Sequence, residues 1–158
     1  MSELDERYLE IDQHGILKIP PSLWFSLFFL ARFWGFLLTS IMSPEILGRG
    51  GFLLTNAGFW IVLICELPVV ILIYAGFSRH PNGGRLARFI WPLGRIIIAL
   101  TAAANLYFLV WWLLHSDYWE RWPELFLVSC GVLDLTAVFA TWGSDYLKQV
   151  FNEFPPKE

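Results

Sequence analysis

The stretch FWIVLICELPVVILIYAGF, residues 59–77, decides the fold class. At a rise of about 1.5 Å per residue, a helix of this length crosses the roughly 30 Å hydrocarbon core of a bilayer. Twelve of its residues are Leu, Ile, Val or Phe. These favour insertion by about 4–7 kcal/mol, against roughly 3 kcal/mol for the acidic Glu66 near the centre. The stretch therefore predicts a transmembrane helix that carries one buried carboxyl group.

The composition of the whole chain is that of a membrane protein. Of its 158 residues, 56% are apolar, 18% are aromatic and only 16% are charged, which is too apolar for a soluble domain of this size. A formal net charge of -3 and the lack of a basic, aromatic-rich patch argue against a nucleic-acid partner. Cys65 and Cys130 each lie inside an apolar run, so we expect buried free thiols rather than a disulfide or a thiolate metal site.

Three further apolar runs complete the predicted architecture, an all-α, polytopic bundle of four transmembrane helices with short loops. The helices are expected at about residues 22–42, 58–77, 93–114 and 125–143. The whole chain, residues 1–158, is expected to be one domain, with a polar N-terminal segment (1–21) and a C-terminal tail (144–158). Because the opening MSELDERYLEIDQ is acidic and polar, we expect no cleaved signal peptide.

The distribution of Lys and Arg predicts the orientation. With four spans, the N-terminal segment, the loop between the second and third helices and the C-terminal tail lie on one side of the membrane. Seven of the 11 Lys and Arg residues lie on this side and two on the other. Since loops rich in Lys and Arg stay in the cytoplasm, we expect both termini to be cytoplasmic.

The loops contain no motif typical of catalysis or cofactor binding. The segments GRGG (48–51) and NGG (82–84) lack the Gly-Lys-Ser/Thr ending of a phosphate-binding loop, so we expect turns. The segment HSDYWERW (115–122) is expected to lie in an interfacial aromatic belt, because adjacent His, Ser and Asp residues do not form a triad. No apolar run contains a His residue, which argues against haem. We therefore expect no enzyme activity, no cofactor and no metal site.

Three charged residues are expected near the middle of the membrane. Arg32, Glu66 and Asp134 each lie seven to ten residues inside a predicted span, which places them within several ångströms of the midplane. We call these residues, with Arg95 as a candidate fourth member, the charge cluster. Arg95 lies at the start of the third helix, where its guanidinium group can instead reach the lipid headgroups. Because a charge that faces lipid is costly, the cluster should face protein.

Within the charge cluster, we expect Arg32 to pair with Glu66. The second helix follows the first through a short loop and is its natural neighbour, which leaves Asp134 as the unpaired, titratable group. Four polar or small residues are expected to support the cluster: Trp34, Pro68, Asn105 and Cys130. Pro68 removes the backbone N–H that would bond to the carbonyl of Ile64, which predicts a kink and a polar layer in the second helix.

The stretch DQHGILKIPPSLWFSLFFLARFW, residues 12–34, resembles the opening of the YfeZ-like inner-membrane proteins. The matching positions are Asp12, Gly15, Leu17, Lys18, Pro20, Trp24, Ala31, Arg32 and Trp34. The resemblance implies a small polytopic protein of the gammaproteobacterial inner membrane, from a domain family without an assigned function. It also draws attention to a cytoplasmic lead-in with Asp12, Gly15 and Lys18, which either caps the bundle or forms an ordinary juxtamembrane turn.

Two functions remain after these exclusions. The first is an accessory or assembly subunit of a larger membrane protein complex, since the short loops leave no soluble domain for catalysis. The second is a small transporter or flippase that works as a homo-oligomer in the lipid bilayer and uses an intramembrane carboxylate. A midplane ion pair that only fixes which helices are neighbours fits the first function, whereas a carboxylate without a cationic partner fits the second.

Overall fold

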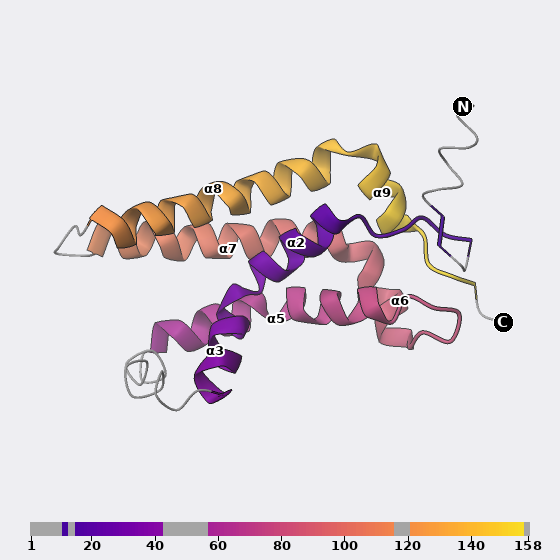
Figure 1. Ribbon diagram of the computed structural model, residues 1–158, viewed down its shortest axis with the longest axis horizontal. Helices are drawn as coiled ribbons and strands as arrows, with labels where there is room; N and C mark the ends of the chain where they lie inside the picture. The colour runs from indigo at the N-terminus through magenta and orange to yellow at the C-terminus, as the bar shows by residue number, and fades with distance from the viewer. Residues whose placement is uncertain (1–10, 13–14, 43–56, 116–120, 157–158) are drawn as a thin grey trace.

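A computed structural model describes residues 11–12, 15–42, 57–115 and 121–156 of the chain. These residues form helices and no strand, apart from one isolated bridge between Ile11 and Leu17. The helices, shown in Figure 1, are α2 (Pro21–Leu30), α3 (Arg32–Met42), α5 (Ala57–Phe77), α6 (Arg85–Ile90), the 3-10 helix η1 (Trp91–Leu93), α7 (Gly94–His115), α8 (Arg121–Gly143) and α9 (Asp145–Asn152).

Three helical stretches of the described chain are long and apolar enough to cross a membrane: Gly58–Phe77, Arg85–Trp111 and Leu125–Gly143. α2 and α3 form a fourth span if the bent pair is counted as one. α7 packs against both α5 and α8, and α2 contacts all three of these helices. The antiparallel α7 and α8 follow the long axis of the molecule (Figure 1). The all-α membrane bundle predicted from the sequence is therefore confirmed.

The first span differs from the single helix expected over about residues 22–42. α2 ends at Leu30, α3 begins at Arg32, and the two helices meet at an angle of 65°. Between them, Ala31 has φ -95° and ψ 21°, outside the helical region. Neither Pro nor Gly lies at this position, so the usual backbone causes of a sharp kink do not apply. The side chains of Arg32 and Glu66 bind the backbone at this point instead.

The core lies where α2 crosses the other helices. Leu23, Leu27 and Leu30 share one face of α2, at spacings of three and four residues, and are fully buried. They form one cluster with buried residues of α5 and with small residues of α7 and α8, including Ala102 and Ala137. Small side chains let helices approach closely where lipid provides no hydrophobic drive for association. The large apolar side chains on the outer faces of the long helices are exposed, as a lipid-facing surface requires.

The C-terminal tail contains a helix that closes one end of the bundle. The side chain of Ser144 accepts a hydrogen bond of 3.3 Å from the N–H of Leu147, which caps the start of α9. The apolar face of α9 is buried, and Phe151 packs on Trp91 with ring centroids 5.0 Å apart. Trp91 Nε1 donates to the carbonyl of Val150 at 2.8 Å. We call the end of the bundle that carries α6 and α9 the terminal end.

The lead-in packs on the terminal end as a small hairpin. The bridge between Ile11 and Leu17 closes it, and Gly15 has φ 72°, a conformation that favours glycine. The N–H of Leu17 donates to the Glu153 carboxylate at 3.0 Å, and the carbonyl of Leu17 accepts from Arg79 Nη1 at 2.6 Å. Through Leu17 the lead-in is therefore joined to Glu153 and Arg79 at the terminal end.

Candidate functional site

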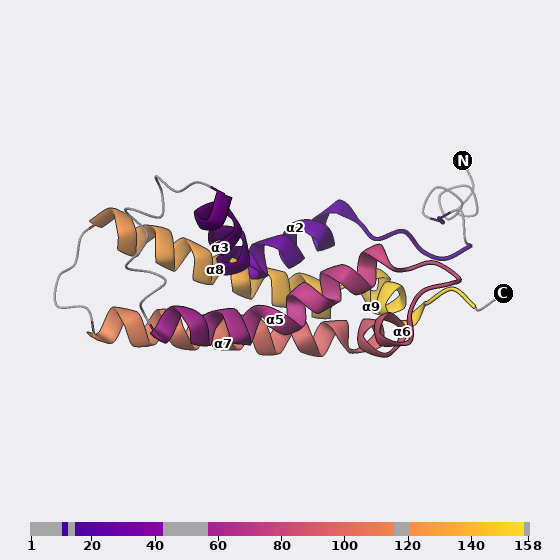
Figure 2. The ribbon, with the colours of Figure 1, turned by 90° about the horizontal axis from the view of Figure 1, so that it is seen from below.

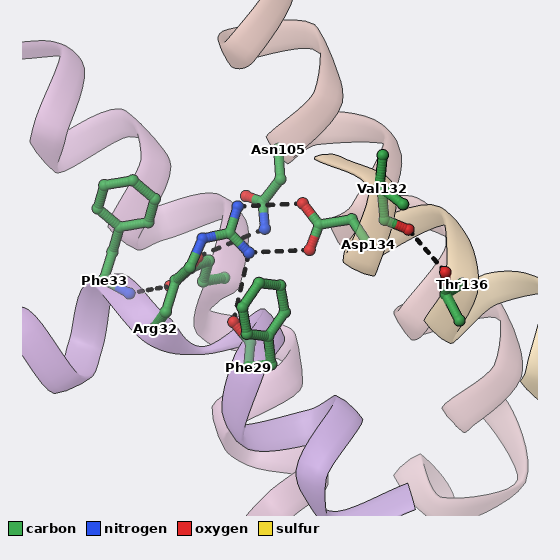
Figure 3. A network of polar contacts seen from close by, with 8 residues as sticks. Phe29, Arg32, Phe33, Asn105, Val132, Asp134 and Thr136 are labelled. Carbon is green, nitrogen blue, oxygen red and sulfur yellow. Dashed lines mark hydrogen bonds and ion pairs between the residues drawn. The ribbon is translucent and has the colours of Figure 1, made fainter. Parts of the chain in front are cut away.

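Arg32 and Asp134 form a bidentate ion pair inside the bundle. Arg32 Nη1 lies 2.8 Å from Asp134 Oδ1, and Nη2 lies 3.0 Å from Oδ2. Figure 3 shows the two groups facing each other between α3 and α8. Asp134 is 1% exposed and the Arg32 side chain 15%. The expectation that Arg32 pairs with Glu66 is therefore wrong, because the break after α2 turns Arg32 toward α8.

Glu66 lies on α5 and is 0% exposed. Its Oε2 accepts a hydrogen bond of 3.1 Å from the backbone N–H of Phe33, and its Oε1 accepts one of 3.5 Å from Asn105 Nδ2 on α7. The described residues give Glu66 no salt bridge, although Arg32 lies close enough for an electrostatic interaction. Glu66, not Asp134, is thus the carboxyl group without an ion-pair partner in the described part of the chain.

Arg32 and Glu66 replace one of the backbone hydrogen bonds that the break interrupts, the bond between Phe33 and Phe29. In a continuous helix, the N–H of Phe33 would donate to the carbonyl of Phe29, four residues earlier. Here the N–H of Phe33 donates to Glu66, while Arg32 Nη1 donates to the carbonyl of Phe29 at 3.3 Å. Both ends of the missing bond therefore have a partner, which a membrane interior requires. Insertion of side chains into the backbone ladder is the physical cause of the 65° bend.

The side chains of Glu66 and Arg32 also suit the helix ends that they contact. α3 begins at the break, so the Glu66 carboxylate lies at the positive N-terminus of a helix. α2 ends there, and Arg32 contacts a carbonyl of its last turn, at the negative C-terminus. An acceptor at a helix N-terminus and a donor at a helix C-terminus satisfy backbone groups that have no partner within the helix. Glu66 on the second span thus serves as an acceptor for the backbone of the first.

Beside the break between α2 and α3, backbone carbonyl groups of α5 form a polar layer. Trp34 Nε1 donates to the carbonyl of Leu63 at 3.0 Å, and Thr101 Oγ1 donates to that of Cys65 at 3.5 Å. These carbonyls flank Ile64, whose normal donor is missing because Pro68 lies inside the helix. α5 changes direction near its middle in Figure 2, as an internal proline explains. Neighbouring helices thus supply donors to α5 in the same layer as the ion pair.

Aromatic and small side chains enclose the ion pair. The guanidinium carbon of Arg32 lies 4.8 Å from the ring centroid of Phe29 and 5.6 Å from that of Phe33, distances at which the ring faces attract a cation. Cys130 is buried one turn before Asp134 on the same face of α8. Asn105 Oδ1 is buried and has no hydrogen-bond partner among the described residues.

Arg95 does not join the charge cluster. It lies ten residues before Asn105 on α7, which corresponds to about 15 Å along the helix axis. Its Nη2 donates to the carbonyl of Trp142 at 3.0 Å, and its guanidinium carbon lies 4.6 Å from the centroid of that ring. Arg95 thus contacts Trp142 near the end of α8, and its access to the lipid headgroups stays a prediction.

The remaining candidate motifs contribute no site to the described structure. In the segment 82–84, the N–H of Gly83 donates to the carbonyl of His80 at 2.8 Å, as in a turn. The segment 48–51 and most of the segment 115–122 lie outside the described residues. Among the residues that are described, no group of three or more His, Cys, Asp and Glu side chains could hold a metal ion.

The sequence matches the family described as "Protein of unknown function (DUF2919)" over residues 7–153. The chain therefore belongs to this family, whereas the narrower YfeZ-like resemblance stays a prediction. No curated protein and no solved structure matches the chain.

Proposed function

We propose that this DUF2919 protein is an accessory or assembly subunit of a larger complex in the bacterial inner membrane, with both termini in the cytoplasm and without enzyme activity. One observation carries the proposal: the intramembrane charges are used within the fold to bend the first span. Arg32 holds Asp134 and the end of α2, and Glu66 holds the start of α3. A transport site instead needs polar groups that are open to a substrate.

The bend sets the direction in which α3 leaves the bundle. The three residues that form the bend, Arg32, Glu66 and Asp134, each cost about 2.5–3.5 kcal/mol of insertion free energy at the centre of a span. A straight first helix would need none of them. This cost is explained if the direction of α3 is itself needed. α3 packs against α5, and its outer apolar side chains, among them Phe36 and Ile41, are exposed. We propose this face as the contact with the partner membrane protein.

Site-specific photo-crosslinking in intact membranes tests the proposal. A benzophenone amino acid in place of Phe36 or Ile41 should crosslink to one membrane protein, which should also co-purify with the untagged chain at a fixed ratio in a mild detergent. The matched control is Phe139, an exposed aromatic side chain on α8. Crosslinks to lipid alone from all three positions, or the same set of proteins from all three, would refute the proposal.

The second candidate is a small oligomeric transporter or flippase, which one observation favours. Transporter sites often form where a spanning helix is broken near the middle of the membrane, and Glu66 lies at such a break without a salt bridge in the described residues. Purified protein in liposomes with a pH-sensitive dye distinguishes the two functions. Proton flux that Glu66→Gln removes and Thr136→Ala leaves intact would establish transport. Flux equal to that of empty liposomes fits the subunit.

A further inference from the structure

A pocket at the terminal end combines charged and aromatic walls. It has a volume of about 520 Å³ and is lined by Asp12, Lys18, Ile19, Trp24, Gly76, Phe77, Arg79 and His80. This volume lies within the range of pockets that hold small molecules. The pocket lies where α2 begins, at Pro21, and where α5 ends, at Phe77. Because α5 and the bent pair of α2 and α3 are candidate membrane spans, we place the pocket at the level of the lipid headgroups.

The polar wall holds charges of both signs. Lys18 and His80 are exposed, whereas Arg79 is buried and donates hydrogen bonds to the carbonyl oxygens of Leu17 and Glu153. Burial lowers the pKa of the Arg79 guanidinium, while the nearby Glu153 and Asp12 carboxylates act in the opposite direction, and an arginine keeps its charge. Arg79 is therefore a fixed cation, and Asp12 is the acidic residue of the lining.

The apolar wall continues onto the lipid-facing surface. The rings of Trp24 and Phe77 lie 4.6 Å apart, and Trp24 stacks on Phe28 at 5.9 Å. Phe77 is 68% exposed, and Phe28 is exposed as well. A Cβ on Gly76 would lie 2.9 Å from Trp24, so glycine is what lets the indole lie against α5. A ligand with a charged head and an apolar chain can thus contact both walls at once.

We propose that this pocket binds a phospholipid with an amine headgroup, such as phosphatidylethanolamine. The phosphate group lies against the cationic side of the pocket, with Lys18 and Arg79, and the ammonium group against the carboxylate of Asp12. An acyl chain follows the aromatic wall of Trp24 and Phe77. Asp12 lies beside the cationic Lys18 and Arg79. Its carboxylate favours a zwitterionic headgroup that can donate a hydrogen bond and disfavours a purely anionic headgroup.

Native mass spectrometry of the full chain in detergent tests the site, with dioleoyl phosphatidylethanolamine, phosphatidylglycerol and phosphatidylcholine added separately. The ethanolamine lipid should bind most tightly to the unaltered chain. Lys18→Ala should weaken its binding about fivefold, the effect of one basic residue near a lipid surface. Asp12→Asn should remove the preference for ethanolamine over choline. Lys148→Ala and Asp145→Asn are matched controls, since both residues are exposed on α9 outside the pocket, and they should leave binding within about twofold.

Three outcomes would overturn the proposal. Equal binding of the three lipids would show that the pocket does not select a headgroup, and this comparison needs no variant. A preference for the glycerol lipid that Asp12→Asn leaves unchanged would identify an anionic-lipid site instead. Displacement of the lipid by inorganic phosphate would identify free phosphate as the ligand. Melting temperatures of the variants, which alter exposed or partly exposed side chains, confirm that a loss of binding is not a loss of fold.

Discussion

The ion pair between Arg32 and Asp134 should be the strongest side-chain coupling within the charge cluster. Asp134→Asn keeps the shape of the side chain but leaves the guanidinium group without its carboxylate partner. Loss of one partner of a buried pair costs about 3–5 kcal/mol. The two hydrogen bonds of 2.8 Å and 3.0 Å, at roughly 1.5–3 kcal/mol each for charged groups, sum to about 3–6 kcal/mol, which overlaps this range. Because the Glu66 carboxylate remains near Arg32, we expect the lower end, about 3 kcal/mol.

The double variant measures whether the two residues act as a unit. Arg32→Leu alone leaves Asp134 buried without a cation and the carbonyl of Phe29 without its donor, so we expect a loss of about 4 kcal/mol. Arg32→Leu combined with Asp134→Asn should cost less than the sum of the single changes by about 2–3 kcal/mol. The same cycle with Glu66→Gln in place of Asp134→Asn should give a coupling below about 1 kcal/mol.

The assay is the free energy of unfolding in mixed micelles, from titration with sodium dodecyl sulfate followed by tryptophan fluorescence. Single and double variants are measured at the same pH and the same total detergent concentration. A coupling below about 0.5 kcal/mol between Arg32 and Asp134, which is the limit of ordinary additivity, would refute the pairing. A coupling to Glu66 that exceeds the coupling to Asp134 would refute it as well.

Three further predictions concern the break, the terminal end and the orientation. Glu66→Gln keeps an acceptor for the N–H of Phe33 and should cost about 1 kcal/mol of unfolding free energy, whereas Glu66→Leu leaves that N–H unpaired and should cost about 1–3 kcal/mol more. Gly94→Ala places a methyl group against the ring of Phe151 and should cost about 1–3 kcal/mol of unfolding free energy. Gly35→Ala is its control, because no atom would lie within 4 Å of the new Cβ, and it should be neutral or stabilising in the same detergent titration. Reporter fusions at the C-terminus and in the loop between α7 and α8 should read cytoplasmic and periplasmic respectively, and a periplasmic C-terminus would contradict the proposed orientation.

The fold class could be predicted because it depends on hydropathy summed over whole spans. A run such as residues 59–77 inserts as a helix whichever helices surround it. The helix in the C-terminal tail was also within reach of the sequence. Leu147, Val150 and Phe151 have the spacing of one helical face, and Ser144 lies at the position of an N-cap.

The partner of Arg32 could not be predicted from the order of the helices. Chain neighbours often pack together, and α3 does pack against α5, yet Arg32 contacts Asp134 on α8. The reason is the bend at Ala31, and its position has no local signal, since the residue is a good helix former. The N–H of Phe33 finds its acceptor in Glu66, 33 residues later in the chain, instead of in the carbonyl of Phe29. A backbone break that depends on a distant side chain does not show in a local pattern.

The exchanged hydrogen bond at Phe33 implies an order of events during biosynthesis. The ribosome delivers the first span before the helix with Glu66 and long before the helix with Asp134, so neither side chain is present when residues 21–42 reach the bilayer. In lipid, an N–H group without an acceptor costs several kcal/mol, which keeps the bond from Phe33 to Phe29 intact at this stage. We therefore expect the newborn span to be straight and the bend to form only when α5 brings Glu66 to Phe33. On this view, residues that are translated later set the final shape of the first span.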